Sequence, residues 1–388
     1  AAAWLNYHVP LWWEDPAHGE TLCTWAFNPN LDRRAPQAMH YVRTRQSPND
    51  WFMFGDSGAG YLNPGMLLEE HRREVSDLPS GLYAWVAHNV PYASRYDLSI
   101  TGFIIDGHSP GMGEEGMDAY LTFSSDGIVG QKIPPQGVRR GVMPYVRMKL
   151  DLHGKPAHAG ANIGSLAGVN VPKFLFIRTI LKSPSWHRET MDAALAANPA
   201  MEFVDPYTFF LLLEAYEGTK EGRAATQSAL TEVEWVAGEE PKGLAPVGVD
   251  DGPFTVTGEG GDAALRQAKP EQTQYVYFEI ADTFAAPFQS TEGKTAVVSV
   301  TLLDNAPGEI GIHFDSHEGS AYRDGPRHAM AGSGEWIELT FELPNAAFAH
   351  GQNGGADFRL INFDNDLAIR SVQVAAGDNV TDDSKGAP

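Results

Sequence analysis

Short apolar runs alternate with helix-like stretches along residues 1–218. Strands are predicted where apolar residues run together, at Thr21–Phe27, Asp50–Phe54, Gly81–Ala87, Ser99–Ile105, Val142–Leu150 and Lys173–Ile180. Helices are predicted at Arg34–Arg45, Pro64–Val75, Pro184–Ala197 and Pro206–Tyr216. Because strands that alternate with helices form βαβ units, this pattern predicts an α/β domain with a mostly parallel sheet, either open or closed like a barrel.

The pattern changes twice after residue 218. Residues 219–270 are rich in glycine, proline and acidic residues, which predicts a linker or connecting segment with one strand at Phe254–Val256. Over residues 271–376 apolar and polar positions alternate with period two, and turns rich in Gly, Asn and Asp separate six or seven short runs. This pattern predicts an all-β sandwich or jelly roll. Residues 377–388 are polar, and we expect a flexible tail there.

Composition narrows the possible partners. The chain has 28 lysines and arginines against 50 aspartates and glutamates, so its formal charge is −22. Phosphate backbones would repel such a chain, so we expect no nucleic-acid partner. No run of about 18 apolar residues occurs, so we expect no membrane insertion. The single Cys23 excludes an intramolecular disulfide and a thiolate zinc site. The chain opens on Ala1 without an initiator methionine or a leader, so we expect a processed chain or a piece of a longer one.

The strongest local signal is the glycine-rich loop that follows the predicted strand Asp50–Phe54. Gly58 and Gly60 let the backbone turn sharply, and the loop sets Asp56 and Tyr61 at the carboxyl end of a strand, where α/β folds place their sites. The loop lacks the Lys-Ser/Thr of a phosphate-binding loop and the GxSxG of a serine nucleophile. A tight turn without a ligand is the alternative.

Polar residues follow other predicted strands in the same way. Together with Asp56 they make a rim of Asn28, Asn89, Asp106, His108, Asp151 and His153. Parallel strands would bring these ends to one face, although each residue alone could be a cap or turn residue. The acidic loop after Asp106 could carry Glu114, Glu115 or Asp118 into the site as a lid, or it could be a solvated loop. A carboxylate pair is the usual device of glycoside hydrolysis, and Asp56 with Asp106 is the pair we expect.

Histidines invite a metal hypothesis. His153 and His158 could meet on a loop with His108, but no HExxH or comparable spacing is present, so we assign no catalytic metal and no cofactor. In the β-region, loops hold polar residues that could form a binding edge or a structural Ca²⁺ site; these are Asp315, His317, Tyr322, Arg323 and Asp324.

The run Gly58-Ala59-Gly60-Tyr61-Leu62-Asn63-Pro64 resembles the signature of the GxGYxYP family of putative glycoside hydrolases. Asn63 replaces the second aromatic residue of that signature. The resemblance covers roughly residues 1–217, and the family usually carries a further N-terminal region. The C-terminal part is similar to the jelly-roll modules attached to many polysaccharide-active proteins. The resemblance implies glycan chemistry, and assembly with itself or with the missing N-terminal region is a further possibility.

These observations predict a secreted or cell-surface glycoside hydrolase that acts on a polysaccharide or oligosaccharide. Asp56, Asp106 and Glu114 are the predicted catalytic residues. The predicted substrate-binding residues are Asn28, Tyr61, Asn89, His108 and His153. The alternative is a non-catalytic glycan-binding or filament-forming surface protein. A polysaccharide lyase or a metal-dependent esterase is a third possibility.

Overall fold

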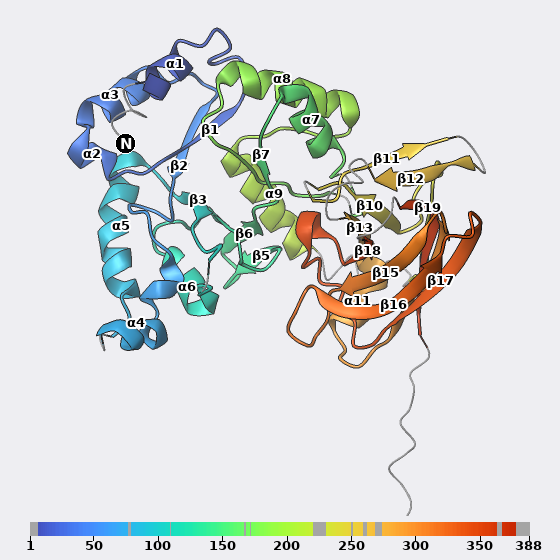
Figure 1. Ribbon diagram of the computed structural model, residues 1–388. Helices are drawn as coiled ribbons and strands as arrows, with labels where there is room; N and C mark the ends of the chain where they lie inside the picture. Colours follow the sequence, from blue (N-terminus) through green and yellow to red (C-terminus); the bar gives the residue numbers. More distant parts are fainter. Residues whose placement is uncertain are drawn as a thin grey trace, which may run out of the picture. The chain divides into compact units, whose positions relative to one another are not determined.

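The structure is a computed structural model (Figure 1). It describes residues 7–76, 79–108, 110–166, 168–170, 172–219, 230–249, 251–258, 262–267, 274–362 and 367–377. The chain divides into two compact units, which are described separately. The α/β unit comprises Ala1–Gly164 and Phe174–Gly222, and the β unit comprises Ser165–Lys173 and Arg223–Pro388.

A six-stranded sheet forms the centre of the α/β unit. Its strands, in sheet order, are β1 (Cys23–Phe27), β2 (Asp50–Phe54), β3 (Ile100–Ile104), β4 (Gly127–Gly130), β6 (Met143–Arg147) and β5 (Gln136–Arg139). All neighbours pair in parallel except β5 and β6. Two further strands, β7 (Leu150–Leu152) and β8 (Ile177–Thr179), make a separate parallel pair. The mostly parallel sheet predicted from the sequence is confirmed.

Helices surround this sheet. They are α1 (Val9–Trp13), α2 (Leu31–Arg34), α3 (Pro36–Thr44), the 3-10 helix η2 (Pro64–Leu67), α4 (Glu69–Ser76), α5 (Leu82–Tyr96), α6 (Gly113–Tyr120), α7 (Pro156–Gly164), α8 (Pro184–Ala197) and α9 (Pro206–Gly218). The helices α8 and α9 begin at the predicted prolines. Each has an N-cap, because Ser183 accepts the Trp186 N–H and Asp205 accepts the N–H groups of Tyr207 and Thr208.

The sheet buries both faces, as a parallel sheet between helices must. Phe52 and Phe54 of β2 belong to one core cluster, which includes apolar side chains of α1, α3, α5 and α6. Met53, between them, belongs to a second cluster on the opposite face with Phe210 and Leu213 of α9. Figure 1 shows α5 and α9 on opposite sides of the strands. The near-continuous apolar run of β2 therefore follows from burial on two faces.

One predicted strand of the α/β unit is a helix in the structure. The run Gly81–Ala87 was expected to be a strand, but it forms the start of helix α5. Its buried residues Leu82, Trp85, Asn89 and Tyr92 recur every three or four positions, which is helical spacing. A short run of consecutive apolar residues does not distinguish a strand from a buried helix, and this one belongs to a helix of 15 residues.

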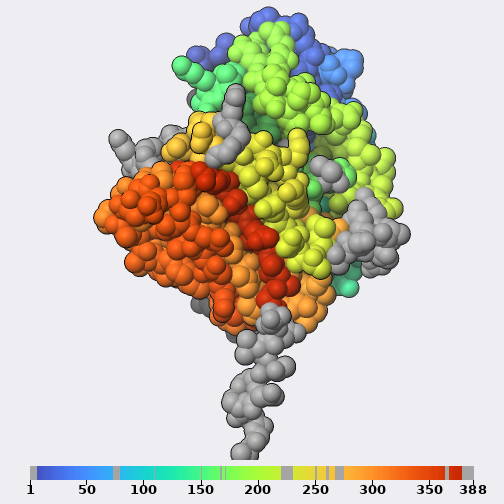
Figure 2. Space-filling view, turned by 90° about the vertical axis from the view of Figure 1, so that its right-hand side faces the viewer, coloured from blue at the N-terminus to red at the C-terminus, as the bar shows by residue number. Residues whose placement is uncertain are grey.

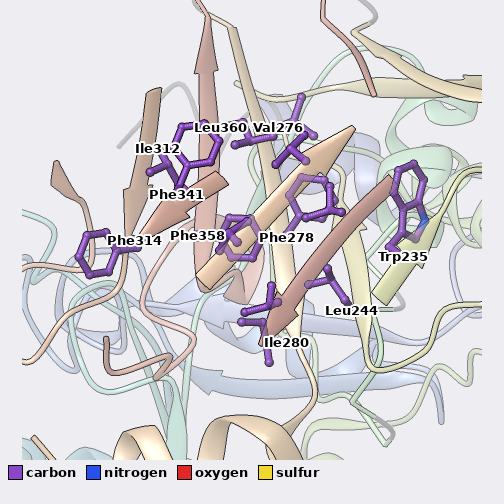
Figure 3. Close-up of a cluster of buried hydrophobic side chains, with 14 of the residues drawn as sticks. Trp235, Leu244, Val276, Phe278, Ile280, Ile312, Phe314, Phe341, Phe358 and Leu360 are labelled. Carbon is purple, nitrogen blue, oxygen red and sulfur yellow. The ribbon is translucent and has the colours of Figure 1, made fainter. Parts of the chain in front are cut away.

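The β unit is an antiparallel sandwich, as predicted. One sheet has the order β10 (Leu244–Val247), β13 (Gln274–Ile280), β18 (Phe358–Asn362), β15 (Pro307–Phe314) and β16 (Arg323–Ala331). The other has β11 (Phe254–Thr257), β12 (Ala264–Gln267), β19 (Ala368–Ala376), β14 (Ala296–Leu303) and β17 (Trp336–Leu343), with β9 (Glu232–Val236) also paired to β19. The short elements α11 (Asp282–Gln289) and η4 (Asn353–Gly355) complete it. Figure 3 shows the core, where Phe278 stacks on Phe358 at 5.2 Å between ring centroids.

The prediction of a linker over residues 219–270 is wrong for its described part. Strands β9, β10, β11 and β12 all lie there and pair with strands of the sandwich. Trp235 of β9 is only 4% exposed and belongs to the main core cluster. In Figure 2 the red residues of β19 run beside the yellow residues of this segment. Strands of four or five residues between Gly and Pro carry little pattern, so the turn residues dominate the sequence signal. The predicted tail after residue 377 lies outside the described residues.

Candidate functional site

A cavity of about 870 Å³ lies within the α/β unit. Strand β1 forms one wall, where Thr24 and Ala26 are exposed between the buried Cys23, Trp25 and Phe27. The segment around β8 and helix α8 form the other walls, and Met53 and Phe103 reach it from β2 and β3. The lining is mostly apolar, with a few polar and charged groups after the strand ends, as in ligand sites of α/β proteins.

Among the described residues, Asp56 is the carboxylic acid that lines this cavity. It follows β2 with a left-handed backbone (φ 57°), and Ser57 continues in the same region (φ 74°). Such conformations cost of order 1–3 kcal/mol for a non-glycine residue and persist where surrounding contacts fix them. Ser57 supplies those contacts, since its hydroxyl donates to the Leu62 carbonyl at 2.8 Å and accepts the Ile105 N–H at 2.7 Å.

Burial raises the pKa of Asp56, while a hydrogen bond with the Asn28 side chain and the charge of Arg178 partly oppose the rise. Asn28 follows β1 and also lines the cavity. The sequence prediction that the ends of β1 and β2 converge is therefore confirmed for these two residues. A carboxyl group with a raised pKa keeps its proton to a higher pH than a free aspartate, which suits a proton donor beside a cavity.

Arg178 is held firmly beside this carboxyl. On β8, its guanidinium donates two hydrogen bonds to the carboxylate of Asp151 on β7 and lies 3.7 Å from the ring centroid of Phe103. The bidentate geometry matches the planar guanidinium to the planar carboxylate and limits its rotation. Asp151, a member of the predicted rim, is thus linked to the cavity through Arg178.

The glycine-rich motif holds the loop in place. The Ala59 N–H donates to Asn89 Oδ1 at 2.6 Å, and the Ala59 carbonyl accepts hydrogen bonds from the Asn30 amide and from His88 Nε2. Gly58 has φ 130°, and a Cβ there would lie 2.5 Å from Asn89 Oδ1, so only glycine fits. The loop then presents Gly60 and the 76%-exposed Tyr61 to the cavity.

Asn63, which replaces an aromatic residue of the family signature, links the motif to the next loop. Its Oδ1 accepts the Gly65 N–H at 2.9 Å and caps η2, while its amide donates to the carbonyls of His108 and Pro110 at 2.8 and 2.9 Å. A Cβ on Gly65 would lie 2.5 Å from the Pro110 carbonyl oxygen, so this position also needs glycine. The motif is thus a scaffold that fixes the cavity wall.

Two of the three predicted catalytic carboxylates do not line the cavity. Asp106 is fully buried, and its two oxygens accept the Gln131 N–H at 2.6 Å and the Lys132 N–H at 3.0 Å. Burial raises the pKa of Asp106, yet it stabilises the turn after β4. Glu114 lies in α6 rather than in a lid loop, and its exposed side chain pairs with Arg139 at 3.4 Å.

Three predicted substrate-binding residues also lie away from the cavity lining. Asn89 is on α5, fully buried, and clamps the motif loop. His108 and His153 are exposed, and neither lines the cavity. The described residues contain no group of three His, Cys, Asp or Glu side chains arranged to hold a metal ion. The Ca²⁺ site suggested for the loops of the β unit stays a prediction; in the structure Asp315 accepts the N–H groups of Ala349 and Gly351.

A cysteine and a histidine meet at the cavity wall, but they do not form a nucleophilic pair. Cys23 Sγ lies 3.5 Å from His187 Nδ1. Burial raises the pKa of the Cys23 thiol to about 12 and lowers the pKa of His187 to about 4. Both groups therefore stay neutral near pH 7, whereas a reactive cysteine needs a thiolate.

Sequence reasoning missed the cationic and aromatic groups of the site. Arg34 after β1 and Arg178, Lys182 and Trp186 around β8 line the cavity, and Lys182 Nζ lies 5.0 Å from the Trp186 ring centroid. The available signal was a cluster of basic residues in a strongly acidic chain, at Arg178, Lys182 and Arg188.

The first part of the chain matches a known family. Residues 1–148 match the family model described as GxGYxYP putative glycoside hydrolase C-terminal domain, which confirms the resemblance drawn from the motif over these residues. No curated protein matches the chain. None of the described helices is long and apolar enough to cross a membrane.

Solved structures show distant likenesses. One is the crystal structure of a putative hydrolase from Bacteroides thetaiotaomicron, 15% identical with a TM-score of 0.44, covering 56% of this chain and 43% of that chain. The chain therefore spans less than half the length of that protein. Another is a family 29 carbohydrate binding module from Piromyces equi, 12% identical with a TM-score of 0.24, covering 38% of this chain and 92% of that module.

Proposed function

We propose that the α/β unit is a glycoside hydrolase in which Asp56 is the general acid. The observation that carries this proposal is the position of Asp56 after β2, at a large cavity, with burial raising the pKa of its carboxyl. A protonated carboxyl can donate its proton to the glycosidic oxygen as the bond to the sugar breaks and positive charge develops on the ring. Asn28, bonded to the same carboxyl, orients it.

We further propose Asp151 as the second carboxylate, in place of Asp106. Glycoside hydrolysis needs a base or nucleophile opposite the acid. Asp151 is about one quarter exposed (29% of its side chain), and Arg178 fixes its orientation through two hydrogen bonds. The same Arg178 acts electrostatically on Asp56, so the two carboxyl groups share one positioning cation. Neither Asp151 nor Asp106 itself lines the cavity, but Asp151 is partly exposed and bound to the cavity residue Arg178, whereas Asp106 is fully buried and bound to backbone N–H groups.

The β unit supplies a candidate accessory binding face for a glycan. On β18, Arg359 lies 3.6 Å from the ring centroid of Tyr275 and 4.5 Å from that of Tyr322, and it donates to Tyr277 Oη at 2.6 Å. Aromatic faces beside polar groups are suited to sugar rings, whose C–H surfaces stack on them. We propose that this face retains a polysaccharide near the catalytic unit, and that the protein works outside the cell or at its surface.

The decisive test compares Asp56→Asn with a matched control. Asparagine tolerates the left-handed backbone at position 56, so the fold should survive. Asp97→Asn is the control, because Asp97 is exposed, has φ 52° and does not line the cavity. Both variants and the parent protein are incubated with a panel of neutral and acidic polysaccharides, and new reducing ends are measured.

Asp56→Asn should lose turnover by roughly 10²–10⁴-fold on any polysaccharide that the parent protein cleaves, while Asp97→Asn keeps full activity. Full activity in Asp56→Asn would refute the assignment. Binding of a glycan by the parent protein without new reducing ends would favour the non-catalytic alternative, and an unsaturated product would indicate a lyase.

A further inference from the structure

The cavity gathers positive charge in a protein that is otherwise strongly acidic. The chain carries 50 acidic residues against 28 lysines and arginines, yet Arg34, Arg178 and Lys182 all line this one cavity. Positive groups that collect around a concave site in an acidic protein focus the field there and favour an anionic ligand.

The three cations occupy defined places around the strand ends. Arg34 ends α2, shortly after β1, and Lys182 follows β8; both line the cavity. Arg178 lies within β8 and is held by Asp151. A ligand in this cavity therefore meets cations from two separate segments of the chain.

Two of these cations differ from several exposed arginines of the α/β unit that form ion pairs. Arg95 pairs with Asp32, Arg140 with Asp118 and Arg188 with Glu20. Among the ion pairs of the described residues, none involves Arg34 or Lys182. The Lys182 ammonium instead lies over the Trp186 ring at 5.0 Å from its centroid. These two side chains are thus positioned at the cavity with their charge available to a ligand.

We infer that the sugar bound in this cavity is anionic, carrying a carboxylate or a sulfate group. This inference rests on the proposed function. The Arg34 fork binds a planar or tetrahedral oxyanion with two hydrogen bonds, and the Lys182 ammonium acts as a point charge. Trp186 and Tyr61 offer ring faces at the same cavity for the sugar ring. The site therefore selects acidic polysaccharides over neutral ones.

The experiment measures binding to the full chain carrying Asp56→Asn, in which the expected turnover is low enough to leave the probes largely intact. The probes are oligosaccharides of polygalacturonate and their methyl esters, chondroitin sulfate and unsulfated chondroitin oligosaccharides, and neutral xylan oligosaccharides. The carboxylate and sulfate arms separate the two sources of negative charge. One or more of the acidic probes should bind more tightly than the neutral xylan probe by about tenfold or more, and added salt should weaken the binding of that acidic probe. Equal binding of neutral and acidic probes, or no binding of any acidic probe, overturns the inference.

Four variants locate the contact. Arg34→Gln and Lys182→Gln remove cavity charges, and at least one of them should lower the affinity for the acidic probe roughly tenfold. Arg33→Gln and Lys155→Gln remove exposed charges that do not line the cavity, and both should bind as before. If all four variants lose affinity alike, or none does, the inference is wrong.

The outcomes distinguish this inference from the proposed function. If acidic probes bind through Arg34 or Lys182 but the parent protein never cleaves them, the anionic site stands and the hydrolase proposal fails. If the parent protein cleaves neutral glycans and the two cavity variants keep full turnover, the hydrolase proposal stands and the anionic site fails.

Discussion

The carboxyl ends of β2 and β3 each carry an aspartate, and the two regions differ in what those carboxyl groups bind. Asp56 after β2 faces a cavity of about 870 Å³ and bonds to one side chain, Asn28. Asp106 after β3 is fully buried, and two backbone N–H groups occupy its oxygens. Burial raises the pKa of both. A perturbed pKa at a strand end therefore does not identify a catalyst unless the carboxyl also has free space beside it.

The largest expected difference is in turnover, between a substitution of Asp56 and the same substitution of Asp106. Asp56→Asn should lower turnover of a cleaved glycan by roughly 10²–10⁴-fold and change the free energy of unfolding by less than about 0.5 kcal/mol. The contrast holds if Asp106→Asn, at a temperature where it stays folded, keeps most of the turnover. Turnover and urea unfolding of both variants provide the check. Loss of activity in a folded Asp106→Asn would break the comparison.

Asp106→Asn should instead lower stability. An asparagine has one side-chain oxygen, so it cannot accept both the Gln131 and Lys132 N–H groups as the carboxylate does. Leaving one buried donor unpaired costs about 1–3 kcal/mol. Tryptophan fluorescence during urea unfolding, read with near-UV circular dichroism, measures the change. A variant as stable as the parent would show that the turn after β4 does not depend on this carboxylate.

The sequence pattern places Asp56 beside Asn28 as the structure does, but it predicts the wrong role for Asp106. The strand Asp50–Phe54 and the helix Pro184–Ala197 were predicted with the bounds that the structure has, because a buried run and a first-turn proline are local signals. The approach of Asn28 to Asp56 followed from parallel topology. The role of Asp106 depended on Gln131 and Lys132, which lie 25 and 26 residues away in the chain, and no local pattern encodes that contact.

The same limit explains the groups that were missed. The pairing of Arg178 with Asp151 joins residues 27 positions apart, and the cavity brings Arg34 next to the segment of β8. Helix α5 was mistaken for a strand because its first residues are uniformly apolar, and its helical spacing shows only over the full 15 residues. Strand β9 was mistaken for part of a linker because five residues carry little periodicity. Local pattern predicted most long elements, while long-range contacts decided the site.

A smaller loss of turnover should follow from loosening the motif loop, which lies between β2 and β3 in the chain. Asn89→Ala removes the acceptor of the Ala59 N–H and the donor to the Trp85 carbonyl. We expect stability to fall by roughly 1–2 kcal/mol and turnover to fall less than in Asp56→Asn, because the loop loses a clamp but keeps its carboxyl. Kinetics and thermal unfolding check this. Turnover lost as fully as in Asp56→Asn would give Asn89 a direct role.

The smallest expected effect is a change of stability with pH. It depends on Asp56 and leaves the geometry of both regions unchanged. Burial raises the pKa of Asp56 above its usual value near 3.8, so a proton stays bound to the folded protein at a pH where the unfolded chain has lost it. The raised pKa therefore favours folding below the ordinary value, and this contribution is lost as pH rises through the raised one. Because Asp56→Asn cannot titrate, its stability should decline less over that window than the parent's.

Turnover by a general acid should fall over the same window, since catalysis needs the protonated carboxyl. A pH profile of kcat/KM, measured beside unfolding at each pH, tests both. If turnover does not change with pH across this window, Asp56 is not the general acid. If Asp106→Asn removes the pH dependence of turnover, the titrating group is Asp106 and the contrast between the two aspartates is wrong.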